Sequence, residues 1–225
     1  FYIDFSRRAR PPGPPGAERR VFRWCPGRLL QRAWRHGAGP RFDTLAGPAD
    51  VYHFPNFIIP PCRRGKTVVT IHDVSFLRFP EAAEDRNLVY LESRIRDTVE
   101  RAALILTDSE FSAGEISEGL QVDPGRIRAI PLGLSPDLRP ADRRSVCRWR
   151  EQRGLTRPYV LCVGTLEPRK NYPLLIDIFE RLEADVDLVM AGMRGWKYEP
   201  ILERVRRSPL RERMHYLEYV SDEEL

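Results

Sequence analysis

The residues best suited to chemistry lie in one loop of the second half of the chain. The apolar run 159–163 has β-branched members and no polar alternation, which predicts a buried strand of a parallel sheet. Gly164 and Thr165 end this strand, and the adjacent cations Arg169 and Lys170 follow. Ligands of open α/β sheets bind at the carboxyl ends of strands, and a helix start beside two positive side chains suits a diphosphate. A plain surface turn would account for the same residues.

An amphipathic helix is predicted to follow this loop, over about 173–184. No G-x-G-x-x-G or Walker sequence occurs in the chain, which argues against a nicotinamide-dependent dehydrogenase and a P-loop kinase. The side of the helix that we expect to be buried carries Leu174, Leu175, Ile178, Phe179 and Leu182.

Polar residues also follow two predicted strands in the first half of the chain. His72 and Asp73 come directly after the predicted buried strand 66–71. We expect His72 to hydrogen-bond a transferred group or to adjust the charge beside it, while a histidine satisfied by core hydrogen bonds fits the sequence too. Asp108 and Ser109 end the next predicted strand. They predict a helix cap, which could also present N–H groups to a substrate.

Three further positions lie at predicted strand ends. His53 and Asn56 belong to the end of a strand over 50–54 and could line an acceptor pocket, although we favour a structural role for both. Gly192 follows the predicted strand 187–191. A glycine there allows a nucleotide to approach the backbone closely, or it simply makes a turn.

Composition is that of a globular protein, with 42% hydrophobic and 31% charged residues and no run of about 18 or more apolar residues. Residues 1–48 hold ten arginines and three acidic residues, a local net charge of +7. This region predicts a solvated face or, more sharply, peripheral contact with anionic lipid or an acidic acceptor. Nucleic acid is not expected, because no recognition helix accompanies the charge. Four cysteines without CxxC spacing indicate a reduced, cytoplasmic setting and no zinc site.

Strands alternate with helices on both sides of a charged, proline-containing segment, so we expect two domains with parallel sheets. The first domain spans 1–134, the linker 135–157 and the second domain 158–225. The chain opens on strand-like residues without a methionine and stops where the pattern predicts that a helix begins, so we expect a fragment cut at both ends.

Taken in order, these segments resemble glycosyltransferase family 4, the retaining GT-B enzymes, and most of all its bacterial mannosyltransferase-like members. The resemblance covers about residues 25–225, and its most specific piece is Gly-Thr-Leu-Glu-Pro-Arg-Lys-Asn at 164–171. The other matching pieces are 50–57, 70–73, 107–112, 130–133, 191–192 and 219–225.

The resemblance implies an α/β fold of the GT-B type, with two Rossmann-like domains whose parallel sheets face a cleft, both incomplete here. It implies that Arg169 and Lys170 hold the donor diphosphate and that Gly164 and Thr165 abut the phosphates. The two cations would offset charge on the leaving diphosphate, so no metal and no cofactor are expected, and the nucleotide-sugar is a substrate. Residues near the base and ribose would be Gly192, Tyr219 and Val220.

On the first domain, the resemblance implies that His72, with Asp73 beside it, contacts the transferred sugar. The acceptor would bind near His53, Asn56 and Ser109. The family's first strand with its Gly-rich loop and its later Glu-x7-Glu region are absent. Because that region supplies carboxylates to the sugar and ribose, we expect the 225-residue chain by itself to be inactive or nearly so.

The function implied is transfer of a hexose, with mannose from GDP-mannose favoured, to a carbohydrate or lipid-linked acceptor. The transfer would retain the anomeric configuration and belong to polysaccharide or lipopolysaccharide biosynthesis. The location would be cytoplasmic, with peripheral contact at the inner membrane surface as the sharper expectation. Two alternatives stand beside it: a nucleotide-sugar epimerase or hydrolase on the same fold, and a non-catalytic module that binds nucleotide-sugars.

Overall fold

The computed structural model describes residues 2–3, 16, 21–22, 26–135, 139–221 and 224. Most of the basic region before residue 26 lies outside the described residues, and so do Cys25 and most of the helix expected after residue 221. The chain forms two compact units. The first comprises Phe1–Leu77 and Val89–Leu132, and the second comprises Arg78–Leu88 and Gly133–Leu225.

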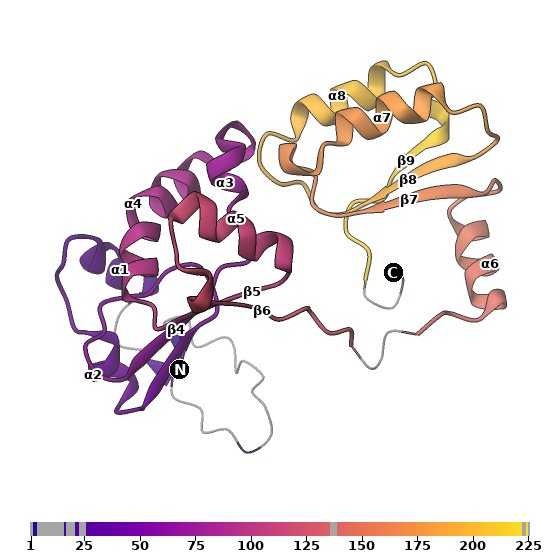
Figure 1. Ribbon diagram of the computed structural model, residues 1–225. Coiled ribbons are helices and arrows are strands. Elements are labelled where there is room, and N and C mark those ends of the chain that lie inside the picture. The colour runs from indigo at the N-terminus through magenta and orange to yellow at the C-terminus, as the bar shows by residue number, and fades with distance from the viewer. Residues whose placement is uncertain are drawn as a thin grey trace. The chain divides into compact units, whose positions relative to one another are not determined.

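The first unit is built on a four-stranded parallel sheet in the order β3-β4-β5-β6 (Figure 1). The long helix α4 (Asp85–Arg101) follows β4 and buries Leu91, Ile95 and Val99, as its 3.6-residue apolar period predicts. Helix α5 (Glu110–Leu120) follows β5. The strands are β3 (Val51–Phe54), β4 (Lys66–Thr70), β5 (Leu104–Thr107) and β6 (Ile127–Ala129).

Shorter elements complete this unit. Strands β1 (Tyr2–Ile3) and β2 (Val21–Phe22) pair in parallel. The helices are α1 (Gly27–Arg35), α2 (Phe42–Ala46), α3 (Ser75–Arg78) and the 3-10 turn Pro124–Arg126; the 3-10 turn Pro80–Ala82 groups with the second unit.

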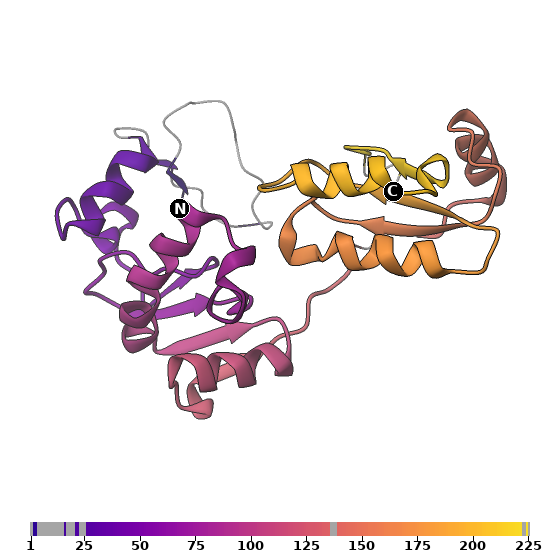
Figure 2. The ribbon, with the colours of Figure 1, turned by 90° about the horizontal axis from the view of Figure 1, so that it is seen from above.

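The second unit holds a three-stranded parallel sheet in the order β7-β8-β9. Helices α7 and α8 lie side by side over one face of this sheet (Figures 1 and 2). The central strand β8 is buried at all five positions. Its elements are β7 (Tyr159–Val163), α7 (Tyr172–Arg181), β8 (Asp187–Ala191), α8 (Glu199–Arg207), β9 (Met214–Tyr216), helix α6 (Arg143–Gln152) and the 3-10 turns Pro168–Lys170 and Arg211–Arg213.

Two expectations for this unit were wrong. Strand β7 is not fully buried: Leu161 is 46% exposed and Val163 51% exposed, because β7 is an edge strand whose only described neighbour is β8. The buried face of α7 also differs from the predicted one. The helix is apolar on most of its circumference, so several stripes compete, and packing selects one. The buried residues are Tyr172, Ile176 and Phe179, whereas Leu174, Ile178 and Leu182 are exposed.

Within the described residues, no helix is both long enough and apolar enough to cross a bilayer. In the same part of the chain, no three His, Cys, Asp or Glu side chains come together as metal ligands would. Cys62, Cys147 and Cys162 are free thiols.

Candidate functional site

Two glycines meet where β7 and β8 end. Gly164 has a φ of +157° and Gly192 a φ of +151°, values that L side chains rarely adopt. The Gly164 amide donates to the Ala191 carbonyl at 2.9 Å, and the Gly192 amide donates to the Glu218 carbonyl at 2.7 Å. A β-carbon on Gly192 would lie 2.0 Å from the Gly164 carbonyl oxygen. Close backbone packing therefore requires glycine at position 192.

The carbonyl group of each of these glycines also accepts a hydrogen bond from a tyrosine hydroxyl. Tyr172 on α7 donates to the Gly164 carbonyl at 2.7 Å, and Tyr216 at the end of β9 donates to the Gly192 carbonyl at 2.9 Å. Burial raises the pKa of Tyr172 well above its ordinary range, and burial likewise raises the pKa of Tyr216. Both hydroxyls therefore keep their protons at neutral pH and hold the strand ends in place.

The loop after Gly164 carries an ion pair that the sequence patterns did not reveal. The Glu167 side chain is only 4% exposed; its Oε1 accepts a hydrogen bond from Arg169 Nε at 3.0 Å and lies 2.9 Å from Arg169 Nη2 in an ion pair. A buried carboxylate requires such a partner. Arg169 is therefore not a free cation: part of its charge is committed to Glu167, and its remaining N–H groups are available to a ligand.

Lys170 is placed differently. It ends the 3-10 turn Pro168–Lys170, and Asn171 follows in the left-handed conformation with φ +51°. The Lys170 side chain reaches back toward Gly164, since its Cε would lie 3.7 Å from a β-carbon at that glycine. Among the described residues no carboxylate forms an ion pair with Lys170. The loop thus has one uncompensated positive charge beside the glycine junction.

The other predicted nucleotide-side residues lie around this junction. The Thr165 methyl packs so tightly on Gly195 that a β-carbon there would approach it to 2.7 Å. Tyr219 is 68% exposed. Glu218, whose carbonyl binds Gly192, pairs through its side chain with Arg194. No contact of these side chains identifies a ligand by itself.

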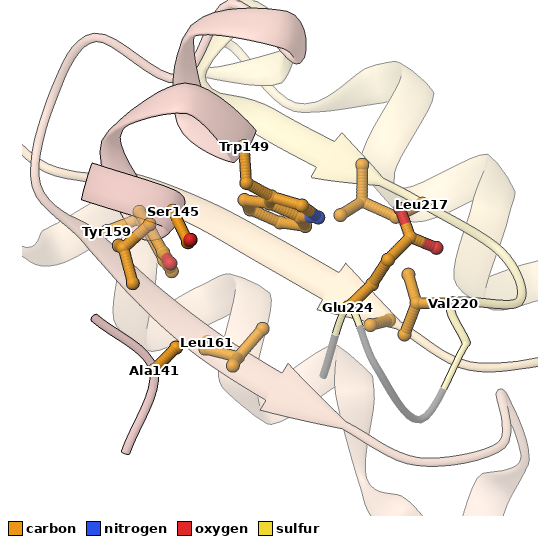
Figure 3. A pocket seen from close by; sticks show the side chains of 10 residues that line it. Ala141, Ser145, Trp149, Tyr159, Leu161, Leu217, Val220 and Glu224 are labelled. Carbon is orange, nitrogen blue, oxygen red and sulfur yellow. The ribbon is translucent and has the colours of Figure 1, made fainter. Parts of the chain in front are cut away.

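Val220 lines a cavity of about 230 Å³ on the sheet face opposite α7, since Leu161 faces it while Cys162 packs toward the α7 core. Figure 3 shows the Trp149 indole reaching from α6 over the strands toward Leu217. Trp149 Nε1 is buried without a hydrogen-bond partner in the described part of the chain. The cavity walls are mostly apolar: Ala141, Ser145, Val146, Trp149, Tyr159, Leu161, Ala191, Leu217, Val220 and Glu224.

In the first unit, His72 lies at the carboxyl end of β4 as predicted. Its Nδ1 is 2.9 Å from Asp108 Oδ2, and its Nε2 is 3.2 Å from the Pro55 carbonyl. The Phe57 ring meets the imidazole edge-on at 5.8 Å. The sequence pointed to Asp108 only as a helix cap. Its partner is 36 residues away, so no local pattern could show the pair.

The remaining predicted residues of this unit have local structural roles. Asp73 Oδ1 accepts from the Ser75 amide at 2.9 Å and so caps α3, and Ser109 is the N-cap of α5, accepting from the Ser112 amide at 3.1 Å. His53 lies within β3, and its Nε2 is 2.8 Å from Thr70 Oγ1. Asn56 is exposed in the following loop. Of these predicted residues, His72 alone pairs with a carboxylate from the end of a neighbouring strand.

Comparison with known protein families identifies the family to which the chain belongs. Residues 3–138 match the model of Glycosyltransferase Family 4, and residues 145–225 match that of Glycosyl transferases group 1. The chain belongs to glycosyltransferase family 4. Its α/β architecture of parallel sheets is accordingly that of a GT-B glycosyltransferase.

Curated relatives and solved structures agree with this assignment. The chain is 32% identical over 180 residues to the O-antigen chain mannosyltransferase B of Escherichia coli, covering 78% of this chain and 47% of that protein. Similarity over 70 residues, at 35% identity, extends to the serotype-specific mannosyltransferase WbdA of the same organism, covering 29% of this chain and 9% of WbdA. The chain thus spans about half the length of the first relative and a small part of the second.

Among solved structures, Anabaena HepE in complex with UDP and glucose superposes with a TM-score of 0.57 at 20% identity, covering 71% of this chain and 43% of HepE. WaaG, a glycosyltransferase involved in lipopolysaccharide biosynthesis, superposes with a TM-score of 0.52 at 16% identity, covering 88% of this chain and 53% of WaaG. At these identities the superpositions establish the fold.

Proposed function

We propose that the protein transfers a hexose, mannose from GDP-mannose in the first instance, to a carbohydrate or lipid-linked acceptor. We also propose that the transfer retains the anomeric configuration and serves the assembly of a surface polysaccharide. Similarity to an O-antigen mannosyltransferase supports the sugar and the setting. The observation that carries the proposal is the uncompensated charge of Lys170 beside the Gly164–Gly192 junction.

The charge of this loop suits a nucleoside diphosphate leaving group. Glu167 cancels much of the Arg169 charge, so the net positive charge comes from Lys170. As the bond to the sugar breaks, negative charge grows on the diphosphate. Lys170 and the outward N–H groups of Arg169 would then stabilise it more in the transition state than in the ground state. These residues can offset the charge of the leaving group without a metal ion.

His72 is the group of the first unit that we assign to the sugar. Its side chain is 42% exposed at the carboxyl end of a parallel strand, where ligands of such sheets bind. One ring edge is held by Asp108, and the other edge contacts only a backbone carbonyl, which a substrate hydroxyl can replace. His72 would hydrogen-bond the transferred sugar. Asp73, Ser109, His53 and Asn56 would shape the surroundings.

The test is a transfer assay on the full-length protein with GDP-mannose, UDP-glucose and ADP-glucose and a mannose-terminated acceptor. We expect nucleoside diphosphate release that depends on the acceptor, and an α-linked product from the α-linked donor, detected by NMR of the anomeric proton. Donor turnover without acceptor would replace the proposal with an epimerase or hydrolase. Donor binding without any turnover would replace it with a binding module.

A further inference from the structure

The carboxylate of Asp108 and the imidazole of His72 form a contact between two neighbouring strand ends. They follow the neighbouring parallel strands β5 and β4, whose residues pair in register up to Thr70 and Leu106. His72 Nδ1 lies 2.9 Å from Asp108 Oδ2, a good hydrogen-bond distance. Ser109, the next residue, already caps α5, so Asp108 is not required there.

Three other contacts fix the position of the His72 ring. The Thr107 hydroxyl donates to the His72 carbonyl at 3.3 Å and anchors the backbone. The Phe57 ring packs edge-on against the imidazole with an interplanar angle of 67°, and the Phe57 amide donates to the Thr70 carbonyl at 2.9 Å. The remaining ring nitrogen, Nε2, faces the Pro55 carbonyl at 3.2 Å. The ring therefore has one defined orientation.

We propose that Asp108 is a positioning residue that fixes the His72 proton at Nδ1 and turns Nε2 toward the substrate. An ionised carboxylate only accepts hydrogen bonds, so Nδ1, at 2.9 Å from Asp108, carries the proton. The Pro55 carbonyl is an acceptor as well, so its longer 3.2 Å contact with an unprotonated Nε2 is not a hydrogen bond, and a substrate hydroxyl replaces it. The Nε2 edge is then the one that meets a hydroxyl of a sugar substrate. The sugar ligand rests on the proposed function; the proton assignment rests on geometry alone.

A purely structural role does not account for the pair. The His72 side chain is 42% exposed and that of Asp108 27% exposed, and pairs this accessible contribute little to stability. Removing the carboxylate should therefore lower Tm by no more than about 2–4 °C. If removal of the Asp108 carboxylate greatly lowers the rate of sugar transfer but barely changes Tm, Asp108 positions the His72 ring.

The proton assignment can be measured without any substrate. The chain has four histidines, so two-bond 1H–15N correlation on the histidine-labelled 225-residue chain resolves each ring, and His72→Gln identifies the signals. We expect the pattern of a ring protonated at Nδ1 in the parent chain. Asp108→Ala and Asp108→Asn should both change that pattern, Asp108→Glu should preserve it, and Asp123→Ala, a carboxylate that accepts from the Gly125 amide, should leave it unaltered. An unchanged His72 pattern in both Asp108→Ala and Asp108→Asn would overturn the proposal.

The kinetic arm uses the full-length protein. Asp108→Ala and Asp108→Asn should lower kcat for sugar transfer about tenfold or more with little change in KM for the donor, and Asp108→Glu should recover part of it. Asp108→Ala in a His72→Ala background should cost nothing further, because the carboxylate acts through the ring. Full additivity of the two changes would refute positioning. If the parent protein transfers no sugar, the proposed function fails, and the NMR result still decides the Asp108–His72 relationship.

Discussion

Gly192 lies against Gly164 so closely that a β-carbon on Gly192 would come within 2.0 Å of the Gly164 carbonyl oxygen and within 2.5 Å of its carbonyl carbon. Both contacts are with backbone, which cannot move aside without disturbing two strand ends. The junction is therefore a rigid feature of the second unit, and the loop that we propose to bind the donor begins on it.

Gly192→Ala should disrupt this junction. The added methyl group combines a backbone clash with a φ of +151°, so we expect a loss of about 3 kcal/mol or more in the free energy of unfolding, measured by urea denaturation. The matched control is Gly114→Ala inside α5, where nothing lies within 4 Å of an added β-carbon. That change should stabilise the protein by about 0.5–1 kcal/mol, since alanine is the better helix former. Equal stability of the two variants would contradict the close packing.

Arg169 and Lys170 should behave differently although they are adjacent. Arg169→Ala leaves the buried Glu167 carboxylate without its partner, so we expect a loss of about 3–5 kcal/mol in unfolding free energy. Lys170→Ala breaks no ion pair within the part of the chain that the structure describes, and it should change stability by less than about 0.5 kcal/mol. Combining Arg169→Ala with Glu167→Gln should recover much of the loss. Comparable stability losses in the two single variants would show that the Glu167–Arg169 pair does not form in solution.

Tyr172 should make the second unit less stable at alkaline pH. Burial raises the pKa of Tyr172 in the folded protein, while in the unfolded chain it titrates near its ordinary value of about 10. Stability contributed by this group is full below about pH 10 and is lost as the pH rises from there through the folded-state pKa. Tyr172→Phe should therefore cost about 1 kcal/mol at pH 7 from the lost hydrogen bond to Gly164, with a smaller deficit at pH 11.

The comparison needs a control for general alkaline destabilisation. Tyr219→Phe, which removes the hydroxyl of a tyrosine that is 68% exposed, is the control and is measured beside Tyr172→Phe at pH 7 and pH 11. A Tyr172→Phe deficit that is constant over this range would mean that Tyr172 titrates normally when folded.

Much of the fold was predictable because its elements carry strong local patterns. Helix α4 (Asp85–Arg101) shows one clear apolar stripe, and Leu91, Ile95 and Val99 on that stripe are buried. The misplaced face of α7 has a physical cause: apolar residues occupy several stripes of the helix, and only tertiary packing selects Ile176, which joins the core cluster, over Ile178. The edge position of β7 depends on which strands flank it, which five apolar residues cannot specify.

The candidate site was predictable in position more than in detail. Gly164, Gly192 and His72 could be singled out because each follows a predicted strand. Their partners were not visible, because Asp108 lies 36 residues from His72 and Glu167 gives no local sign that Arg169 neutralises it. Such pairings depend on how strands assemble and on which side chains are buried.

Substitution of Ser109 distinguishes a role in capping α5 from a role in binding the acceptor. Its hydroxyl accepts from the Ser112 amide, so Ser109→Ala should cost about 1 kcal/mol, as loss of an N-cap usually does. Transfer kinetics of the full-length protein should stay unchanged below Tm. Ser93→Ala, on the exposed middle of α4, is the control and should be nearly neutral. A rise in KM for the acceptor in Ser109→Ala would assign Ser109 to the acceptor site instead.

The central claim concerns Lys170, and calorimetric titration with GDP-mannose tests it most directly. The measurement compares the full-length protein with Lys170→Ala and with Lys66→Ala, an exposed lysine at the start of β4. Losing a charge-assisted hydrogen bond to phosphate should weaken donor binding about tenfold or more in Lys170→Ala, while Lys66→Ala binds as the parent does. Equal affinity of Lys170→Ala and the parent protein for GDP-mannose, UDP-glucose and ADP-glucose would contradict the account.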